Sequence, residues 1–130
     1  MNRCLLALFL VGSLGVVSGC GGDDANALKV GGECSNLQDC GVDPEEQPPP
    51  LECLAGFKGG YCGKTGCTAS SECPEGSACA DFEGIFYCFL TCTDKSECNQ
   101  NRGVDNESNC SSNYKTVENT EQKLCIPPAG

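Results

Sequence analysis

The chain has 130 residues, of which 14 are cysteine and none is histidine, and its 18 acidic against eight basic residues give a formal net charge of −10. Cysteine above a tenth of the residues is typical of a disulfide scaffold. Large aliphatic residues are scarce beyond the N-terminal segment, so we expect no sizeable hydrophobic core. The acidity argues against nucleic acid and anionic head groups as partners. It indicates solubility and spacing from an anionic cell surface, with a specific cationic partner as the alternative.

The N-terminal segment predicts export. Arg3 and the amino terminus give a short positive region, and the apolar run Cys4–Val17 is shorter than the about 20 residues that span a bilayer. These features are typical of a cleaved signal peptide. The run ends in the residues Val17, Ser18, Gly19 and Cys20.

This ending resembles the lipobox of bacterial lipoproteins, in which an aliphatic residue and two small residues precede a cysteine. The resemblance implies that residues 1–19 are a signal peptide and that Cys20 becomes the lipid-bearing first residue of the mature chain, acylated with chains such as palmitate. Two or more acyl chains anchor a protein stably. Gly21 stands where an Asp marks inner-membrane retention in enteric lipoproteins, which favours the outer membrane. An ordinary signal peptide, with Cys20 merely nearby, is the alternative.

Residues 20–32 are predicted to be the lipidated cysteine followed by a flexible tether. The stretch after Cys20 is polar, rich in glycine and without periodicity. A first edge strand around Leu28–Val30 is the alternative.

Twelve cysteines follow this segment, and an even number in an exported chain indicates a disulfide framework. They form three units of four, and each unit opens with the same pattern of Cys, Ser or Thr, three residues, an acid and Cys. We therefore predict three modules over residues 33–64, 65–90 and 91–126, followed by a tail over 127–130. The short links between them predict that the modules stack as a short rod.

Each module is expected to contain an opening turn and a closing hairpin. The hydroxyls of Ser35, Thr68 and Thr93 are placed to hydrogen-bond backbone N–H groups just ahead, which favours a short turn over a long helix. In the second module Glu83-Gly84 is expected to turn between aromatic strand formers, and residues 57–61 play the same part in the first. The aromatic residues are interpreted as a cover for the disulfides, with ligand stacking as the alternative. The densest apolar cluster is Phe82, Ile85, Phe86 and Phe89.

The stretch Cys67–Cys79 reads Cys-Thr-x-x-x-Glu-Cys-Pro-x-Gly-x-x-Cys, which resembles the Dickkopf N-terminal, EB-like and EGF-like cysteine-rich modules. The resemblance covers residues 33–125. It implies a small disulfide-rich fold of tandem four-Cys modules, with short β-hairpins and turns and little regular secondary structure. It carries over no receptor-contacting residues.

Four cysteines permit three connectivities, so the spacing leaves the pairing open. The resemblance implies first-to-third and second-to-fourth bonds within each module. The implied pairs are Cys34–Cys53, Cys40–Cys62, Cys67–Cys79, Cys73–Cys88, Cys92–Cys110 and Cys98–Cys125. Closing loops of this size stabilises by about 3 kcal/mol each in the chain-entropy model, which would replace the missing core.

The sequence predicts no cofactor, catalytic centre or metal site. Zinc sites usually use Cys-x-x-Cys knuckles, often with His, and the chain has neither. Acidic residues crowd the third module without the spacing of an EF-hand, so a solvated loop is favoured over a calcium site. They are Asp94, Glu97, Asp105 and Glu107. Because the chain lacks a histidine base and an identifiable activated nucleophile, we expect that it is not an enzyme.

The sequence as a whole favours a membrane-anchored, non-enzymatic binding or interaction module of the cell envelope. Its lipid on Cys20 would reach the membrane, and its other partner would be an unidentified envelope or extracellular protein. One alternative is a small protease inhibitor that presents Glu45–Leu51, because the proline-rich insert 42–51 is expected to be an exposed loop with polyproline character. Another is a structural spacer.

Alkylation of the purified, unreduced protein should label no cysteine between residues 33 and 125, because all twelve are expected in disulfides. After reduction, the same reagent should label all twelve. Mass spectrometry of the digested protein measures both states. Several labelled thiols before reduction, or metal that co-purifies with the protein, would contradict the disulfide prediction.

Overall fold

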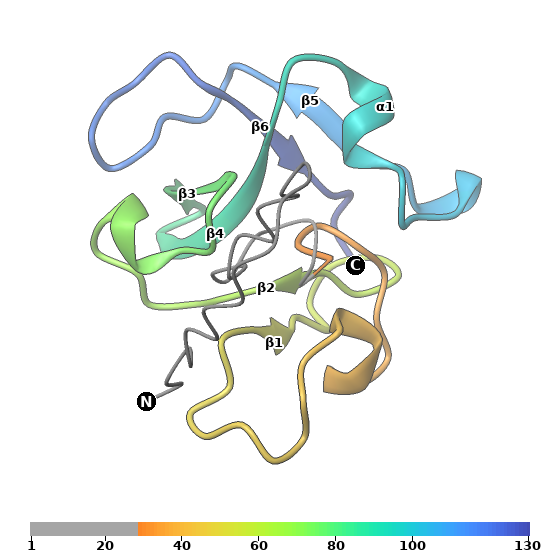
Figure 1. Ribbon diagram of the computed structural model, residues 1–130. Coiled ribbons are helices and arrows are strands. Elements are labelled where there is room, and N and C mark those ends of the chain that lie inside the picture. Colours follow the sequence, from red (N-terminus) through yellow and green to blue (C-terminus); the bar gives the residue numbers. More distant parts are fainter. Residues whose placement is uncertain (1–28) are drawn as a thin grey trace, which may run out of the picture.

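Closing hairpins and single helical turns make up the regular structure of residues 29–130, the part that the computed structural model describes (Figure 1). The expected signal peptide, Cys20 and most of the expected tether lie outside these residues. The helical turns are η1 (Leu37–Cys40), η2 (Ser70–Glu72), α1 (Lys95–Cys98) and η3 (Val104–Asn106). The strands are β1 (Glu52–Cys53), β2 (Cys62–Gly63), β3 (Ser77–Phe82), β4 (Ile85–Cys92), β5 (Asn109–Ser111) and β6 (Lys123–Ile126). The predicted small disulfide-rich fold is confirmed, and no helix within 29–130 is long and apolar enough to cross a membrane.

All strand pairs are antiparallel and fall into two sheets. Strand β1 pairs with β2, and the second sheet has the order β3-β4-β6-β5. Strand β4 belongs to two modules, because its residues up to Leu90 pair with β3 while Thr91 and Cys92 pair with β6. In Figure 1 the chain after β6 returns to the first module, where Ala129 bridges to Phe57. The expectation of a short rod is wrong, because the first module contacts the third directly: Tyr61 donates to the Cys125 carbonyl and Arg102 donates to the Gly60 carbonyl.

Each module is a turn clamped onto a hairpin by two disulfides. The third and fourth cysteines face each other across the closing strands in the pairs Cys53↔Cys62, Cys79↔Cys88 and Cys110↔Cys125. Each of them is bonded to a cysteine of the opening segment and not to its neighbour across the strands. The six bonds are the same pairs that the resemblance implies. Their Cα–Cα distances of 5.3–6.0 Å are ordinary for disulfides.

The opening turns are capped by the acid of the repeat, which reaches back toward the start of the turn. The carboxylates of Asp39, Glu72 and Glu97 accept hydrogen bonds from the backbone N–H groups of Ser35 at 2.8 Å, Thr68 at 2.6 Å and Thr93 at 2.6 Å. The threonine hydroxyls donate to the same carboxylates. The expectation that these hydroxyls bond forward to the backbone is wrong, because a carboxylate four residues later is the stronger acceptor. The expectation of short turns is correct.

An aromatic cluster joins the modules into one core. The buried ring of Phe89 lies 5.6–6.3 Å, centroid to centroid, from the rings of Tyr61, Tyr87, Phe82 and Phe57. Leu124 and Ile126 of the third module pack against the same cluster. The first module also has a small apolar cluster of its own, whereas this aromatic cluster takes residues from all three modules. The aromatic residues therefore do more than cover the disulfides, and of the predicted apolar cluster only Ile85 and Phe86 are exposed.

Tyr61 fixes this core by hydrogen bonds as well as by packing. Its fully buried hydroxyl donates to the Cys125 carbonyl at 3.0 Å and accepts from the Leu90 N–H at 3.1 Å. Tyr61 belongs to the first module, Leu90 to the second and Cys125 to the third. Burial raises the pKa of Tyr61 above its ordinary value, so the hydroxyl stays protonated and can serve as donor and acceptor at once.

Arg102 forms a second connection between the first and third modules. Its side chain is buried, and the guanidinium donates to the carbonyls of Gly31 at 3.2 Å, Gly60 at 2.8 Å and Lys58 at 2.7 Å. The N–H on Nε donates to the Asn106 carbonyl at 2.6 Å. A guanidinium has five N–H donors in a fixed plane, so one arginine can bind several backbone segments that come together around it.

The ends of the described chain also pack on the first module. Residues 29–32 were expected in the flexible tether, yet Val30 is only 3% exposed and Gly31 N–H donates to the Cys62 carbonyl at 2.9 Å. This part of the tether prediction is wrong for two reasons. The backbone of these residues hydrogen-bonds to the edge of β2 that β1 leaves unpaired, and the Val30 side chain packs in the apolar cluster of the first module. In the expected tail, the Pro128 carbonyl accepts from Lys58 N–H at 3.1 Å.

The proline-rich insert of the first module is an exposed loop with buried ends. Val42 is 4% exposed and Leu51 is fully buried, and both join a small cluster with the disulfides of that module. The residues between them, from 43 to 48, are exposed, as expected. The loop therefore begins and ends at fixed points.

Replacing Tyr61 by phenylalanine should destabilise the protein by about 1–3 kcal/mol, because it leaves the buried Cys125 carbonyl and Leu90 N–H without their partner. Guanidinium unfolding with the disulfides intact, followed by near-ultraviolet circular dichroism, measures the change. The matched control is Tyr114→Phe, at a partly buried ring that packs on Phe82 at 5.2 Å, where we expect a change of less than about 0.5 kcal/mol. Equal midpoints for the two variants would contradict the role of the Tyr61 hydroxyl.

Acid should weaken the opening turns. Hydrogen bonds from the backbone N–H groups of Thr68 and Thr93 hold the pKa of Glu72 and of Glu97 below the ordinary carboxyl value. The unfolded chain therefore takes up protons at a higher pH than the folded chain, so this stabilisation is complete above about pH 4.3 and is lost as the pH falls through the lowered pKa values. The thermal midpoint should thus fall between pH 5 and pH 2, and less steeply in Glu72→Gln with Glu97→Gln. Glu75→Gln, which removes an exposed carboxylate outside the turns, should keep the full slope; a slope unchanged in the double variant would contradict this account.

Candidate binding groove

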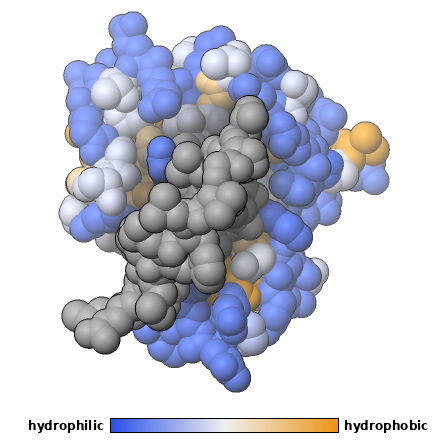
Figure 2. All heavy atoms as spheres, viewed as in Figure 1, coloured by the Kyte–Doolittle hydropathy of each residue, from blue (hydrophilic) through white to orange (hydrophobic). Residues whose placement is uncertain are grey.

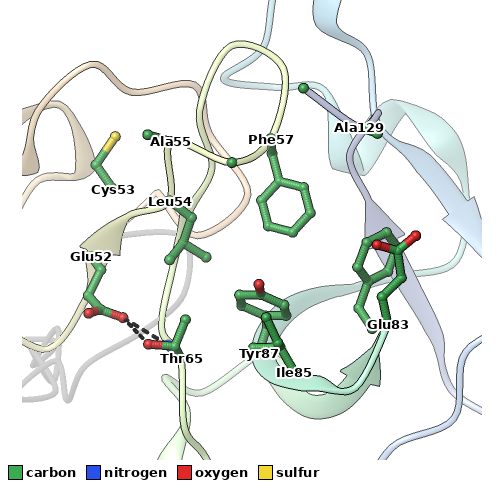
Figure 3. A pocket seen from close by; sticks show the side chains of 13 residues that line it. Glu52, Cys53, Leu54, Ala55, Phe57, Thr65, Glu83, Ile85, Tyr87 and Ala129 are labelled. Carbon is green, nitrogen blue, oxygen red and sulfur yellow. Dashed lines mark hydrogen bonds between the residues drawn. The ribbon is translucent and has the colours of Figure 1, made fainter.

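A groove opens between the first module and the tip of the β3–β4 hairpin, with a volume of about 510 Å³ (Figure 3). Volumes of this size are typical of ligand sites. Its lining residues come from four stretches of the chain. They are Glu52 to Phe57; Thr65; Phe82, Glu83, Ile85 and Tyr87; and Ala129 and Gly130.

The hairpin presents alternate side chains of β4 to this groove. Its turn has positive φ at both Glu83 (54°) and Gly84 (86°), as two-residue hairpin turns require, and the Gly84 N–H donates to Asp81 Oδ1 at 2.7 Å. Successive side chains of a strand point to opposite faces, so Ile85, Tyr87 and Phe89 share one face. Phe89 lies in the core, whereas Ile85 and Tyr87 line the groove. The predicted turn at Glu83-Gly84 is thus confirmed, and it positions the groove wall.

Aromatic and aliphatic side chains form the walls of the groove. The ring of Phe57 lies edge-on to Tyr87 at 5.4 Å and to Phe82 at 5.6 Å, and Leu54 lines the groove with them (Figure 3). The groove is therefore continuous with the aromatic core. Figure 2 shows a mostly hydrophilic surface with small hydrophobic areas on its visible face. Of the three large hydrophobic residues exposed within 29–130, Ile85 and Phe86 lie at this hairpin tip.

Carboxylates stand at the rim, and no basic residue lines the groove among the described residues. Glu52 Oε2 accepts from Thr65 N–H at 2.9 Å and from Thr65 Oγ1 at 2.7 Å, which fixes its position. Figure 3 places Glu83 on the other side of Tyr87 from Glu52. The charge at this rim is thus negative on both sides.

The two lysines that flank the groove segments direct their amines to other partners. Lys58 Nζ donates to the Asp105 carbonyl at 2.9 Å, and Lys64 Nζ donates to the Glu72 carbonyl at 3.4 Å. Neither forms an ion pair with Glu52 or Glu83 within the described residues. The groove carboxylates are therefore not neutralised by the chain's own described lysines.

The acids of the third module do not gather into one site. Asp94 and Glu97 cap α1, and Glu107 pairs with Lys95 at 2.6 Å. Asp105 contributes its backbone carbonyl to Lys58. Two of these acids are therefore close in the sequence because they cap α1, and Glu107 is explained by its ion pair with Lys95.

The sulfur clusters of the modules have a covalent explanation. In each module three Sγ atoms lie within 4.8 Å of one another, because the two disulfides that clamp the turn stack side by side. Every cysteine within residues 29–130 is disulfide-bonded. The cysteines hold the module together and leave the groove to other residues, apart from Cys53 at its edge.

One wall of this groove was predictable from the sequence, and the other was not. Phe82 and Ile85 belong to the apolar cluster that it singled out, and Tyr87 was among the aromatic residues considered for ligand stacking. Glu52 and Thr65 were missed, because they meet only when β1 pairs with β2 and the chain after β2 continues to the bridge between Thr65 and Tyr87. The Glu45–Leu51 loop, the candidate inhibitory segment, does not line the groove.

The chain was compared with known proteins by family, by sequence and by structure. No family model, curated protein or solved structure matches it significantly. The resemblance to extracellular cysteine-rich modules therefore remains a prediction from the repeat pattern, and functional argument has to come from the site itself.

Proposed function

We propose that this chain is a non-enzymatic lipoprotein of the cell envelope whose disulfide-stapled body binds a partner protein. The disulfide-stapled body is suited to an interaction or structural role. The groove beside the β3–β4 hairpin is the observation that favours binding over a spacer, because a spacer needs no hollow lined by Leu54, Phe57 and Tyr87. A stapled body loses little freedom when it binds, which favours affinity.

The anchoring part of the proposal rests on the sequence. Cys20 follows an apolar run and two small residues in the pattern of a lipobox, and Gly21 favours the outer membrane. Lipid on this cysteine would hold the body at the membrane surface without a spanning helix.

A protease inhibitor is the second candidate, and one observation favours it. The exposed residues 43–48 lie between buried Val42 and Leu51, next to the disulfides of Cys40 and Cys53. An exposed loop with fixed ends is the arrangement that small stapled inhibitors use. Stable binding of a protease that is lost when Glu45–Leu51 is replaced by a glycine-serine linker would favour this candidate over the groove.

Cys20→Ser should release the protein from the membrane. Expressed at full length in a bacterium, the wild-type chain should partition into the detergent phase and carry acyl mass, whereas Cys20→Ser should be aqueous and unacylated. The matched control is Cys4→Ser, which removes a thiol from the apolar run and leaves the lipobox intact. Wild-type protein without acyl mass, or equal partitioning of Cys20→Ser and Cys4→Ser, would contradict the proposed anchor.

A further inference from the structure

The groove combines three properties that together specify the charge of its occupant. Its walls are aromatic and aliphatic, with Phe57 packed against both Phe82 and Tyr87. Glu52 and Glu83 stand on opposite sides of it. No lysine or arginine lines it within residues 29–130.

Aromatic rings and carboxylates attract the same kind of ligand. A cation is drawn to the face of an aromatic ring by the negative potential of its π-system, and to a carboxylate by its charge. Lysine and arginine side chains add an aliphatic stem that packs on apolar surface while the charged head stays in water. Leu54 and Ile85 supply such surface beside the rings.

Glu52 is held for this role by the chain itself. Both of its hydrogen bonds from Thr65 go to Oε2, so Oε1 faces no described donor and keeps its acceptor capacity. The carboxylate therefore needs no rearrangement to meet a cation, which lowers the cost of binding.

Charge also argues against a second copy of this chain, or an anionic ligand, as the occupant of the groove. A second copy of this chain carries a formal net charge of −10, and its exposed proline-rich loop contains Glu45 and Glu46. Such a loop, or any anionic ligand, would meet Glu52 and Glu83 with like charge.

We infer that the groove between Leu54–Phe57 and the β3–β4 hairpin binds a lysine or arginine side chain, flanked by apolar residues, on an extended segment of a partner protein. The inference names the partner chemistry of the proposed binding function and is independent of the lipid anchor. It assigns a specific cationic partner to an acidic chain.

Binding is tested with the full-length protein in non-ionic detergent micelles and four probes that differ only in the central residue. The probes are acetyl-Leu-Lys-Leu-amide, acetyl-Leu-Arg-Leu-amide, acetyl-Leu-Gln-Leu-amide and acetyl-Leu-Glu-Leu-amide. Methyl NMR shifts of Leu54 and Ile85 report the groove, and those of buried Val30 and Leu124 report the fold. The lysine and arginine probes should saturate the groove shifts with a dissociation constant at least fivefold lower than the glutamine probe.

Two charge changes separate a local site from general acidity. Glu52→Gln with Glu83→Gln should weaken the lysine and arginine probes by about fivefold, while Glu45→Gln with Glu46→Gln, which removes the same charge from the exposed loop, should change them less than twofold. Glu83→Lys should reverse the preference toward the glutamate probe, and its control, Glu46→Lys, should not.

The outcomes decide between the interpretations. Equal affinity for the lysine and glutamine probes, or equal weakening in the groove and loop variants, would overturn the cationic site. So would shifts at Val30 and Leu124 without shifts in the groove, or no binding of any probe. Membrane partitioning of Cys20→Ser is measured separately, so loss of the cationic site and loss of the anchor are distinguishable.

Discussion

The arrangement of the modules depends on non-covalent contacts centred on the buried Tyr61, because each disulfide stabilises only the module that contains it. All six bonds lie within modules, and none joins one module to another. The relative placement of the modules is left to non-covalent contacts, of which the Tyr61 hydroxyl is the only hydrogen-bonding group in the described chain that joins all three. Its bonds to Cys125 and Leu90 fix the register of the aromatic core around Phe89. The groove follows from that placement, since its walls come from different modules.

The acidity of the chain is partly structural. Glu72 and Glu97 close the opening turns, and Glu33 accepts hydrogen bonds from Gly103 N–H at 2.7 Å and Asn106 Nδ2 at 3.0 Å. Glu118 similarly binds Ser70 at 2.7 Å. Composition alone indicates solubility for these charges, but the structure shows that several serve as acceptors for backbone N–H groups. The carboxylates of the groove rim differ from these acids. Within the described residues, Glu83 and Oε1 of Glu52 accept no hydrogen bond and can bind a ligand.

Local features of this protein were predictable, and long-range ones were not. The repeated cysteines, the turn at Glu83-Gly84 and the short opening turns depend on residues within a few positions of one another, so their patterns are visible in the sequence. The contacts of Arg102 with Gly31 and Gly60 span 71 and 42 residues, and no local sequence pattern predicts them. The same holds for Glu52 on β1 with Thr65, which lies 13 residues later and beyond the end of β2. One wall of the groove was therefore predictable, whereas its closure by the first module was not.

The interlaced pairing within each module has a consequence for how the bonds are made. As the chain is synthesised, Cys34 and Cys40 appear before either of their partners, and the same order recurs in the other two modules. An oxidase that joined thiols in order of emergence would link the two cysteines of each opening turn and leave the hairpin pair to react together. Each module would then hold two wrong bonds that block the native clamp. The native clamp therefore forms when oxidation waits for the hairpin, or when thiol–disulfide exchange replaces the early bonds with the native ones.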